Sequence, residues 1–314
     1  MLNRRHLRVR VLQTLYAYHA SDVKEVNRYE KSLLDSVDQV YAMYIWTLGL
    51  LEDVADYAQR DADDRAGKYL PSEDDLNASI KLVSNTFIES LRHNQTYKDA
   101  IKKYQVNWSF DPEIVKGVFD QLKASPQYAE YLQLEDRSIG VEKDIIKFIF
   151  KKIILVFPVV EQAFEEKFIN WPIDKDVLQA MLAKTLKNFQ SEVPSQNHLA
   201  PVSQNWAEDR VFALDLLSNS IRYQEQYQQL IQEKTMNWEA ERIALMDTLL
   251  MRMAICELLN FPSIPVKVTM NEYIDIAKEF STPKSNTFIN GILDKILQDL
   301  QSTGRIRKNE RGML

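Results

Sequence analysis

The sequence predicts an all-α fold, and three observations carry this prediction. The chain has 314 residues, of which 45% are apolar, so it is long enough to bury more than one helical core. It contains only seven glycines, and β-branched clusters bounded by paired turn residues are scarce. Over long windows the apolar residues instead recur at helical spacing. We therefore expect two helical units and little strand.

Composition also limits the function. The 39 basic and 45 acidic residues give a formal net charge of −6, so any RNA site has to be local. The single cysteine, Cys256, has apolar neighbours and no partner for an internal disulfide, which favours a core position and the cytoplasm. The N-terminus is too basic for a signal peptide. The most apolar run, 145–160, carries lysines and a proline and is expected to be a core helix that does not span a membrane.

The first part of the chain predicts a short helix followed by a long one. No proline occurs from Met1 to Leu70. The periodic apolar positions of the long helix are Leu33, Val37, Val40, Tyr41, Tyr44, Leu48 and Leu51. An acidic cluster at 61–64 suggests a calcium loop, but Ala66 stands where such a loop needs glycine. A solvated helix end is the preferred interpretation, and no metal site is predicted.

The middle of the chain shows organisation without chemistry. Residues 77–190 hold further helical pattern interrupted by prolines, with aromatic core anchors and no catalytic motif. Residues 191–204 are rich in Ser, Pro, Gln and Asn, which is typical of a linker or surface loop. A domain boundary near Ala200 is expected from this change in composition.

The C-terminal part predicts three or more helices. Residues 206–234 have the pattern of one helix, and a second is expected from near Trp238 to just before Pro262. Thr269 and Glu272 fit a capping box at the start of the next helix. Val268 and Tyr273 fit the accompanying hydrophobic staple. A last helix is expected to turn Ile289, Ile292, Leu293, Ile296 and Leu300 inward.

No catalytic or cofactor chemistry is indicated. The seven glycines are too far apart for a phosphate-binding loop, and the four histidines form no helical pair that could hold zinc. No strained glycine elbow marks a nucleophile. We expect no enzyme activity, no cofactor and no metal.

The N-terminal segment is the local exception to the acidic composition. Its basic residues, Arg4, Arg5, His6, Arg8 and Arg10, all precede the first acidic residue of the chain. On a helical wheel the arginines at 4, 5 and 8 share one side with two core leucines, and burying unpaired guanidinium groups is costly.

We therefore expect Leu12, Leu15 and Tyr16 to pack, while the first two turns overhang the bundle and hold their arginines in solvent for phosphates. An alternative is that a charged N-terminus only keeps the chain soluble.

Two separated sets of motifs resemble one known family. The C-terminal set is Ile264-Pro265-Val266-Lys267-Val268, Asn271-Glu272, Ala277-Lys278 and Phe288-Ile289-Asn290-Gly291-Ile292-Leu293-Asp294-Lys295, preceded by Met246-Asp247 and Glu257-Leu258. The N-terminal set is Arg4-Arg5, Arg8, Leu12-Gln13 and Leu15-Tyr16. Together they closely resemble the NusB transcription antitermination family, from Met1 to about Ala20 and from about Ser203 to Lys295.

The resemblance implies a NusB-like pair of small helical bundles that binds boxA-type RNA together with NusE, a small-subunit ribosomal protein. The RNA polymerase elongation complex would be an indirect partner, and no catalysis is involved. The implied RNA-binding residues are Arg4, Arg5, Arg8, Tyr16, Lys284, Ser285, Asn286 and Phe288. The implied partner-binding residues are Met246, Asp247 and Leu250. Phe288 also fits a core stripe, and helix surface charge is the simpler interpretation of Asp247.

The resemblance also has limits. It predicts a NusB-like core from residues 1–40 and 200–314, whereas 41–199 is an inserted helical region of unknown role. His6 stands where a further arginine is usual. A protein-binding scaffold that kept the fold but lost RNA recognition is the main alternative. An RNA-modifying enzyme ranks last, because the chain lacks the cofactor loop of the methyltransferases to which NusB-like domains are sometimes fused.

Overall fold

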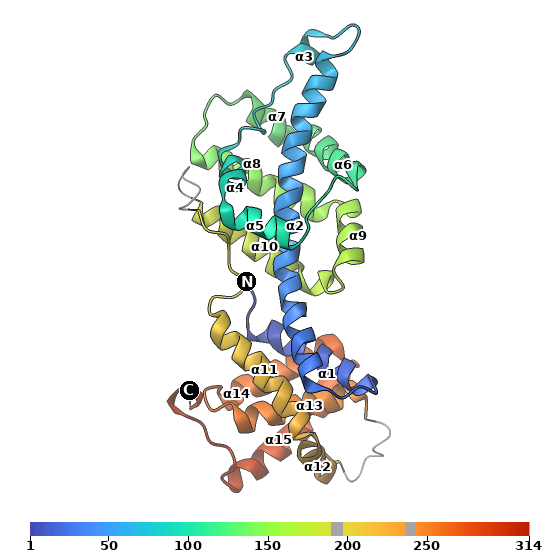
Figure 1. Cartoon of the computed structure of the whole chain (residues 1–314). Helices are drawn as coiled ribbons and strands as arrows, with labels where there is room; N and C mark the ends of the chain where they lie inside the picture. Colours follow the sequence, from blue (N-terminus) through green and yellow to red (C-terminus); the bar gives the residue numbers. More distant parts are fainter. Residues whose placement is uncertain (190–196, 236–242, 314) are drawn as a thin grey trace. The chain divides into compact units, whose positions relative to one another are not determined.

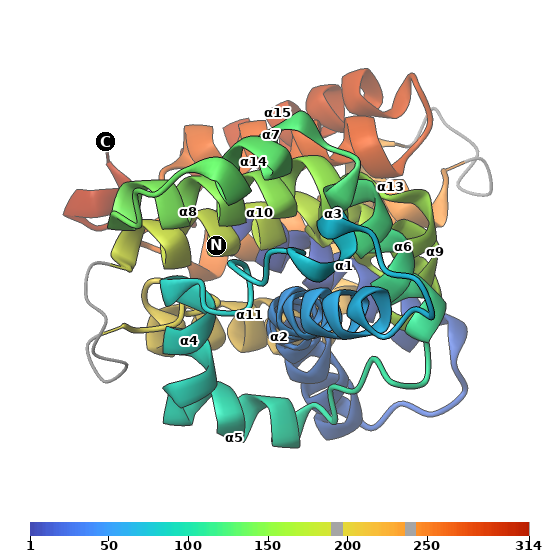
Figure 2. The ribbon, with the colours of Figure 1, turned by 90° about the horizontal axis from the view of Figure 1, so that it is seen from above.

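The computed structural model describes residues 1–189, 197–235 and 243–313. All regular structure in these ranges is helical, which confirms the all-α prediction (Figures 1 and 2). The α-helices of the first part are α1 (Arg4–Ala20), α2 (Val26–Ala66), α3 (Glu73–Leu76), α4 (Thr86–His93), α5 (Gln95–Lys103), α6 (Pro112–Lys123), α7 (Pro126–Gln133), α8 (Ile139–Phe148), α9 (Pro158–Lys167) and α10 (Trp171–Asn188). Those of the second part are α11 (Trp206–Arg222), α12 (Gln224–Lys234), α13 (Leu245–Asn260), α14 (Val266–Phe280) and α15 (Ser285–Ser302). A π-helical turn, η1 (Ile149–Ile153), and two 3₁₀ turns, η2 (Ile154–Val156) and η5 (Glu310–Gly312), complete the fold.

The chain divides into two compact units, each with its own core. One unit combines Leu2–Val37 with Asn205–Leu314, and the other combines Met1 with Asp38–Gln204. We call them the terminal unit and the middle unit. Helix α2 contributes its first turns to the terminal unit and the rest to the middle unit. The assignment of roles to residues 1–40, 41–199 and 200–314 stays a prediction, because compactness does not assign a role.

In the terminal unit, α13 is the central core helix. It packs against α1, α11, α12, α14 and α15, and apolar residues all around its axis are buried. Cys256 is fully buried among them, and burial raises the pKa of its thiol to about 11. The expected role of Cys256 as a small core hydrophobe is confirmed.

In the middle unit, the long helix α2 is the central element. Its 41 residues confirm the predicted long amphipathic helix, and the part within this unit buries Val40, Tyr44, Leu48 and Leu51 completely. The acidic cluster near its end is still helical, and Asp61 pairs with Lys123 at 2.7 Å. Within the described ranges, no group of three potential ligands is arranged to hold a metal ion.

Three expected elements differ from the structure. Residues 145–160 do not form one core helix, because the chain passes through η1 and η2 and becomes extended at Phe157, as expected for a residue that precedes a proline. The single helix expected over 206–234 is broken at Tyr223 into α11 and α12. The expected start near Trp238 lies outside the described residues, and α13 begins at Leu245.

The linker was predicted over residues 191–204, and its first part lies outside the described residues, which omit 190–196. Residues 197–204 have no helix and mix exposed positions (His198, Pro201 and Gln204) with buried ones. Asn197, Ala200 and Ser203 are buried, and the Ala200 N–H donates to the Thr185 hydroxyl at 3.2 Å. The described part of the predicted loop is therefore anchored to the core at every third residue and exposed between these anchors.

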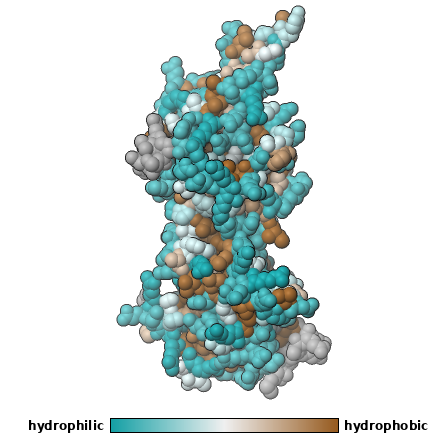
Figure 3. All heavy atoms as spheres, viewed as in Figure 1, coloured by the Kyte–Doolittle hydropathy of each residue, from teal (hydrophilic) through white to brown (hydrophobic). Residues whose placement is uncertain are grey.

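The outward faces of the helices are polar, as the helical periodicity of the sequence predicts. The face seen in Figure 3 is mostly hydrophilic, with apolar side chains in small patches. None of the described helices is both long enough and apolar enough to cross a membrane.

Candidate nucleic-acid interface

Helix α1 begins with a reciprocal cap that the sequence analysis missed. The Asn3 side chain accepts a hydrogen bond from the His6 N–H at 3.1 Å, and His6 Nδ1 accepts one from the Asn3 N–H at 3.2 Å. The sequence signal for this cap is an asparagine placed three residues before a side chain that can accept a hydrogen bond. His6 therefore fixes the start of the helix that carries the arginines.

Arg8 is buried, so the expected overhang is wrong for this residue. Its side chain is 3% exposed, and its guanidinium donates two hydrogen bonds of 2.8 Å to the carboxylate of Glu257 on α13. Burial alone would lower the pKa of Arg8, but the hydrogen bonds and charge of Glu257 outweigh it and raise that pKa above its ordinary value. Arg10 is also buried, at 2% exposure.

Glu257 is the centre of this buried polar cluster. It is fully buried and also accepts hydrogen bonds from the Thr269 hydroxyl at 2.8 Å and the Tyr273 hydroxyl at 3.1 Å. The helical wheel predicted an exposed Arg8 because it describes α1 alone and does not include the carboxylates of other helices. An acid among the apolar residues around Cys256 was the signal that could have indicated a buried ion pair.

The same cluster overturns the expected capping box. Helix α14 begins at Val266 after Pro265, so Thr269 lies inside the helix and caps nothing. Its hydroxyl instead donates to Glu257, and Glu272 faces α1. The helix starts directly after Pro265, four residues earlier than a capping box at Thr269 would place it.

Arg5 and Arg4 are half-exposed and also have acidic neighbours. Arg5 donates to Glu272 at 3.0 Å and to Asp275 at 2.9 Å, and these contacts raise the pKa of its guanidinium, chiefly through the Glu272 hydrogen bond. Arg4 lies 4.0 Å from Asp209. Both arginine side chains are 38% exposed. The basic segment is therefore partly neutralised within the fold, unlike the free patch that we expected.

These arginines border a hollow of about 480 Å³. Its lining combines the first turns of α1 with the segment that leads into α14: Asn3, Arg4, Arg5, Arg8, Ser263, Ile264, Pro265, Val268 and Glu272. A hollow with two half-exposed guanidinium groups has the geometry to take a phosphate through bidentate hydrogen bonds. We call it the arginine hollow.

The second predicted RNA element lies around the start of α15. Lys284 is exposed, while Asn286 and Phe288 are half-buried. Ser285 is only 3% exposed, and its hydroxyl donates to Asp247 at 2.8 Å. Ser285 thus holds the start of the helix and has little surface to offer to RNA.

Asp247 and Leu250 are not accessible to a partner. Asp247 is 5% exposed and accepts hydrogen bonds from Ser281 and Ser285, so neither a partner contact nor a solvated helix charge describes it. Leu250 is fully buried. Of the three partner-binding candidates only Met246 is half-exposed.

The predicted RNA residues do not form one continuous cluster. Ser285 contacts Asp247, and Arg8 contacts Glu257. Asp247 and Glu257 are ten residues apart on α13, which corresponds to a rise of about 15 Å. Tyr16 is 46% exposed, so the expectation that it packs is wrong, and it lies about 17 Å along α1 from Arg5. Leu12 and Leu15 are buried as expected.

We expect Asp247→Ala to loosen the start of α15. The change leaves the Ser281 and Ser285 hydroxyls without their acceptor, which should cost about 1 to 3 kcal/mol. Hydrogen exchange should become faster at the first amides of α15, whereas Lys295→Ala, on an exposed face of the same helix, serves as the control. Equal exchange in both variants would contradict the structural role of Asp247.

The fold and the arginine hollow define a class of protein: a small α-helical bundle with cationic side chains at a surface depression.

Comparison with known proteins identifies the family within this class. Residues 175–298 match the model of the NusB family. The chain therefore carries a NusB-family domain, as its motifs predicted. The match begins within α10, earlier in the chain than the resemblance from about Ser203, and it does not include α1.

Three relatives share the printed name "Transcription antitermination protein NusB". The protein of Salinibacter ruber is 45% identical over 105 residues, which cover 33% of this chain and 66% of the relative. That of Chloroherpeton thalassium is 47% identical over 78 residues, covering 25% and 37%. That of Koribacter versatilis is 38% identical over 95 residues, covering 30% and 65%. The chain thus spans less than two thirds of each of these relatives. No solved structure matches it.

Proposed function

We propose that the terminal unit binds single-stranded RNA of the boxA type at the arginine hollow and acts in transcription antitermination, without catalysis. The carrying observation is that Arg4 and Arg5 are half-exposed at this hollow in a chain that carries a NusB-family domain. Guanidinium groups suit phosphates, and the 46% exposed ring of Tyr16 suits an unpaired base. The cytoplasmic location stays a prediction.

Arg8 has a different role in this proposal. Its guanidinium is held by Glu257 and Glu272, so it positions α1 against α13 and α14 and does not itself contact RNA. Arg4 and Arg5 then bind phosphates. Lys284, Asn286 and Phe288, which retain exposed surface near the start of α15, form a second contact.

The acidic neighbours of the arginines make a protein partner necessary for tight binding. A phosphate at Arg5 has to compete with the Glu272 and Asp275 carboxylates, which lowers the affinity of the isolated protein. We propose that NusE, the ribosomal protein that the family resemblance implies, supplies the missing affinity and links the complex to RNA polymerase. Met246 is the partner-binding candidate that retains surface.

Titration of labelled boxA-like RNA into the protein tests this proposal. We expect Arg4→Ala/Arg5→Ala to weaken binding about tenfold or more and to reduce the slope of log affinity against log salt by about 2, one for each lost phosphate contact. Asp275→Asn should strengthen binding, because it removes a competitor of the phosphate. Arg28→Ala, an exposed arginine of the same unit outside the hollow, is the matched control.

The same titration separates RNA binding from a scaffold function. The carboxylates that neutralise Arg4 and Arg5 favour the scaffold as the second candidate. If the wild-type protein binds NusE but no RNA at low salt, with or without NusE, the scaffold is the correct function. If the double arginine variant behaves like Arg28→Ala, RNA binding does not use the arginine hollow.

A further inference from the structure

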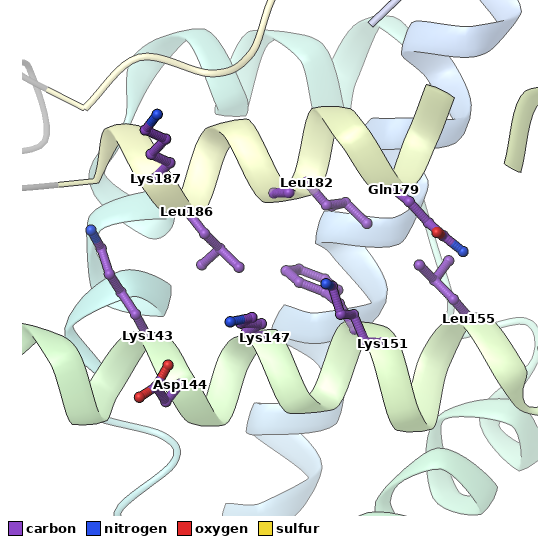
Figure 4. Close-up of a pocket in the computed structure, with 11 residues that line it drawn as sticks. Lys143, Asp144, Lys147, Lys151, Leu155, Gln179, Leu182, Leu186 and Lys187 are labelled. Atoms are coloured by element: carbon purple, nitrogen blue, oxygen red, sulfur yellow. The ribbon is translucent and has the colours of Figure 1, made fainter. Parts of the chain in front are cut away.

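The middle unit contains a groove that the proposed RNA function does not use. It has a volume of about 400 Å³ and runs between α10 and the segment formed by α8, η1 and η2 (Figure 4). Its lining residues on one side are Lys143, Asp144, Lys147, Phe150, Lys151 and Leu155, and on the other Gln179, Leu182, Ala183, Leu186 and Lys187. The first set lies outside the range that matches the NusB family. We call this feature the lysine groove.

The groove combines an aliphatic floor with a basic rim. Figure 4 shows Leu186 and Leu155 pointing into the space between the two helical segments, with Lys143 and Lys187 near the same end. Four lysines and one aspartate line the groove, an excess of positive charge in a chain whose net charge is −6. The groove is therefore both apolar and locally cationic.

The rim lysines differ from the arginines of α1 because they are not neutralised within the fold. Lys143, Lys147, Lys151 and Lys187 form no ion pair with any residue in the described part of the chain. Burial even lowers the pKa of the Lys143 ammonium group below its ordinary value. Four ammonium groups around an apolar floor outnumber the single carboxylate, that of Asp144, and create a local potential that attracts an anionic ligand.

The backbone beside the floor is irregular in a way that often marks binding sites. Ile149–Ile153 form a π-helical turn within the lysine-bearing wall, and the Ile154 N–H donates to the carbonyls of both Ile149 and Phe150, five and four residues earlier. Such turns are rare and frequently occur at functional sites. This turn lies between Lys147 and Leu155 and sets the register in which Phe150 and Lys151 meet the groove.

The shape and lining distinguish between possible ligands. Phe150 is the one aromatic residue in the lining, so the groove offers no row of rings on which successive bases of RNA could stack. The lining on α10 runs from Gln179 to Lys187, a rise of about 12 Å, or roughly two helical turns. A floor of leucines over this length matches the apolar stripe of a short helix.

From these observations we propose that the lysine groove binds an acidic amphipathic helix of a partner protein. The leucines of that helix lie on Leu155, Leu182 and Leu186, and its flanking carboxylates pair with Lys143, Lys147, Lys151 and Lys187. The middle unit thus provides a second docking surface, which is independent of RNA.

A synthetic helix tests this proposal on the full-length protein. The probe is a fluorescein-labelled peptide of about 14 residues with leucines at every third and fourth position and glutamates elsewhere. We expect binding by fluorescence anisotropy with a dissociation constant on the order of 10 µM. A peptide with lysines in place of the glutamates should not bind.

Two variants and one matched control examine the two halves of the site. Lys147→Glu/Lys151→Glu should weaken binding about tenfold or more, because the two substitutions reverse charge on the rim. Both lysines are exposed, so the core is not disturbed. Ala183→Trp, at an exposed floor position, should weaken it similarly by filling the groove. Lys152→Glu is the matched control. Lys152 is also exposed but does not line the groove, so reversing its charge should leave binding unchanged.

Several results would overturn the proposal. They are the absence of probe binding by the wild-type protein, equal effects of Lys147→Glu/Lys151→Glu and Lys152→Glu, and unchanged binding by Ala183→Trp. Displacement of the probe by oligouridine RNA or by phosphatidylglycerol vesicles, at lower concentration than by unlabelled peptide, would assign the groove to another ligand. In the groove variants, binding of boxA-like RNA should stay as in wild type.

Discussion

Arg8→Met should lower the free energy of unfolding of the terminal unit by about 3 to 5 kcal/mol, because it leaves the buried Glu257 carboxylate without its cation. Two hydrogen bonds of 2.8 Å are lost with the charge, and Glu257 keeps only hydroxyl donors. Urea unfolding followed by circular dichroism measures this difference. RNA binding should be lost only under conditions in which the variant is unfolded.

Two further variants make this prediction specific. Arg4→Met removes a half-exposed arginine with one distant carboxylate and should cost less than about 1 kcal/mol. Arg8→Met/Glu257→Gln removes both charges and should be more stable than Arg8→Met alone. A double variant as unstable as Arg8→Met would mean that packing, and not the ion pair, explains the loss.

Trp171→Ala should destabilise the middle unit by a comparable amount, about 3 to 5 kcal/mol, because it leaves a large cavity at the start of α10. Trp171 is 1% exposed, and its ring centroid lies 4.9 Å from that of Phe164. Hydrogen exchange of amides in Asp38–Gln204 measures the effect. The lysine groove should lose its probe under the same conditions, since α10 forms one of its walls.

The control for this cavity is two residues away. Ile169 is 92% exposed, so Ile169→Ala should change stability by no more than about 0.5 kcal/mol. If Trp171→Ala and Ile169→Ala had the same small effect, the core of the middle unit would not depend on Trp171.

Sequence periodicity predicted the secondary structure well where one face of a helix is buried. The long helix α2 and the inward stripe of α15, from Ile289 to Leu300, follow directly from apolar spacing. It failed where local geometry interrupts a continuous pattern. The π turn after Phe148 and the break at Tyr223 lie in windows whose composition still suits a helix. Such breaks depend on backbone packing that a one-dimensional pattern does not contain.

The sequence predicted which arginines share the first helix, but it did not predict the environment of each. The position of Arg4, Arg5 and Arg8 on one helix follows from their spacing. Their different exposures follow from Glu257 and Glu272, which lie about 250 residues away in sequence and reach them only through the packing of α1 on α13 and α14.

By itself, the sequence determined the fold class, the family of the C-terminal part and the presence of a basic first helix, because apolar periodicity and local motifs are encoded within short windows. The tertiary structure alone decided which charges are free. It buries Arg8 on Glu257 and ties Asp247 to α15, while no carboxylate in the described part of the chain forms an ion pair with the rim lysines of the lysine groove. Ion pairing depends on distances of a few ångströms between side chains of different helices, and only the packed chain sets those distances.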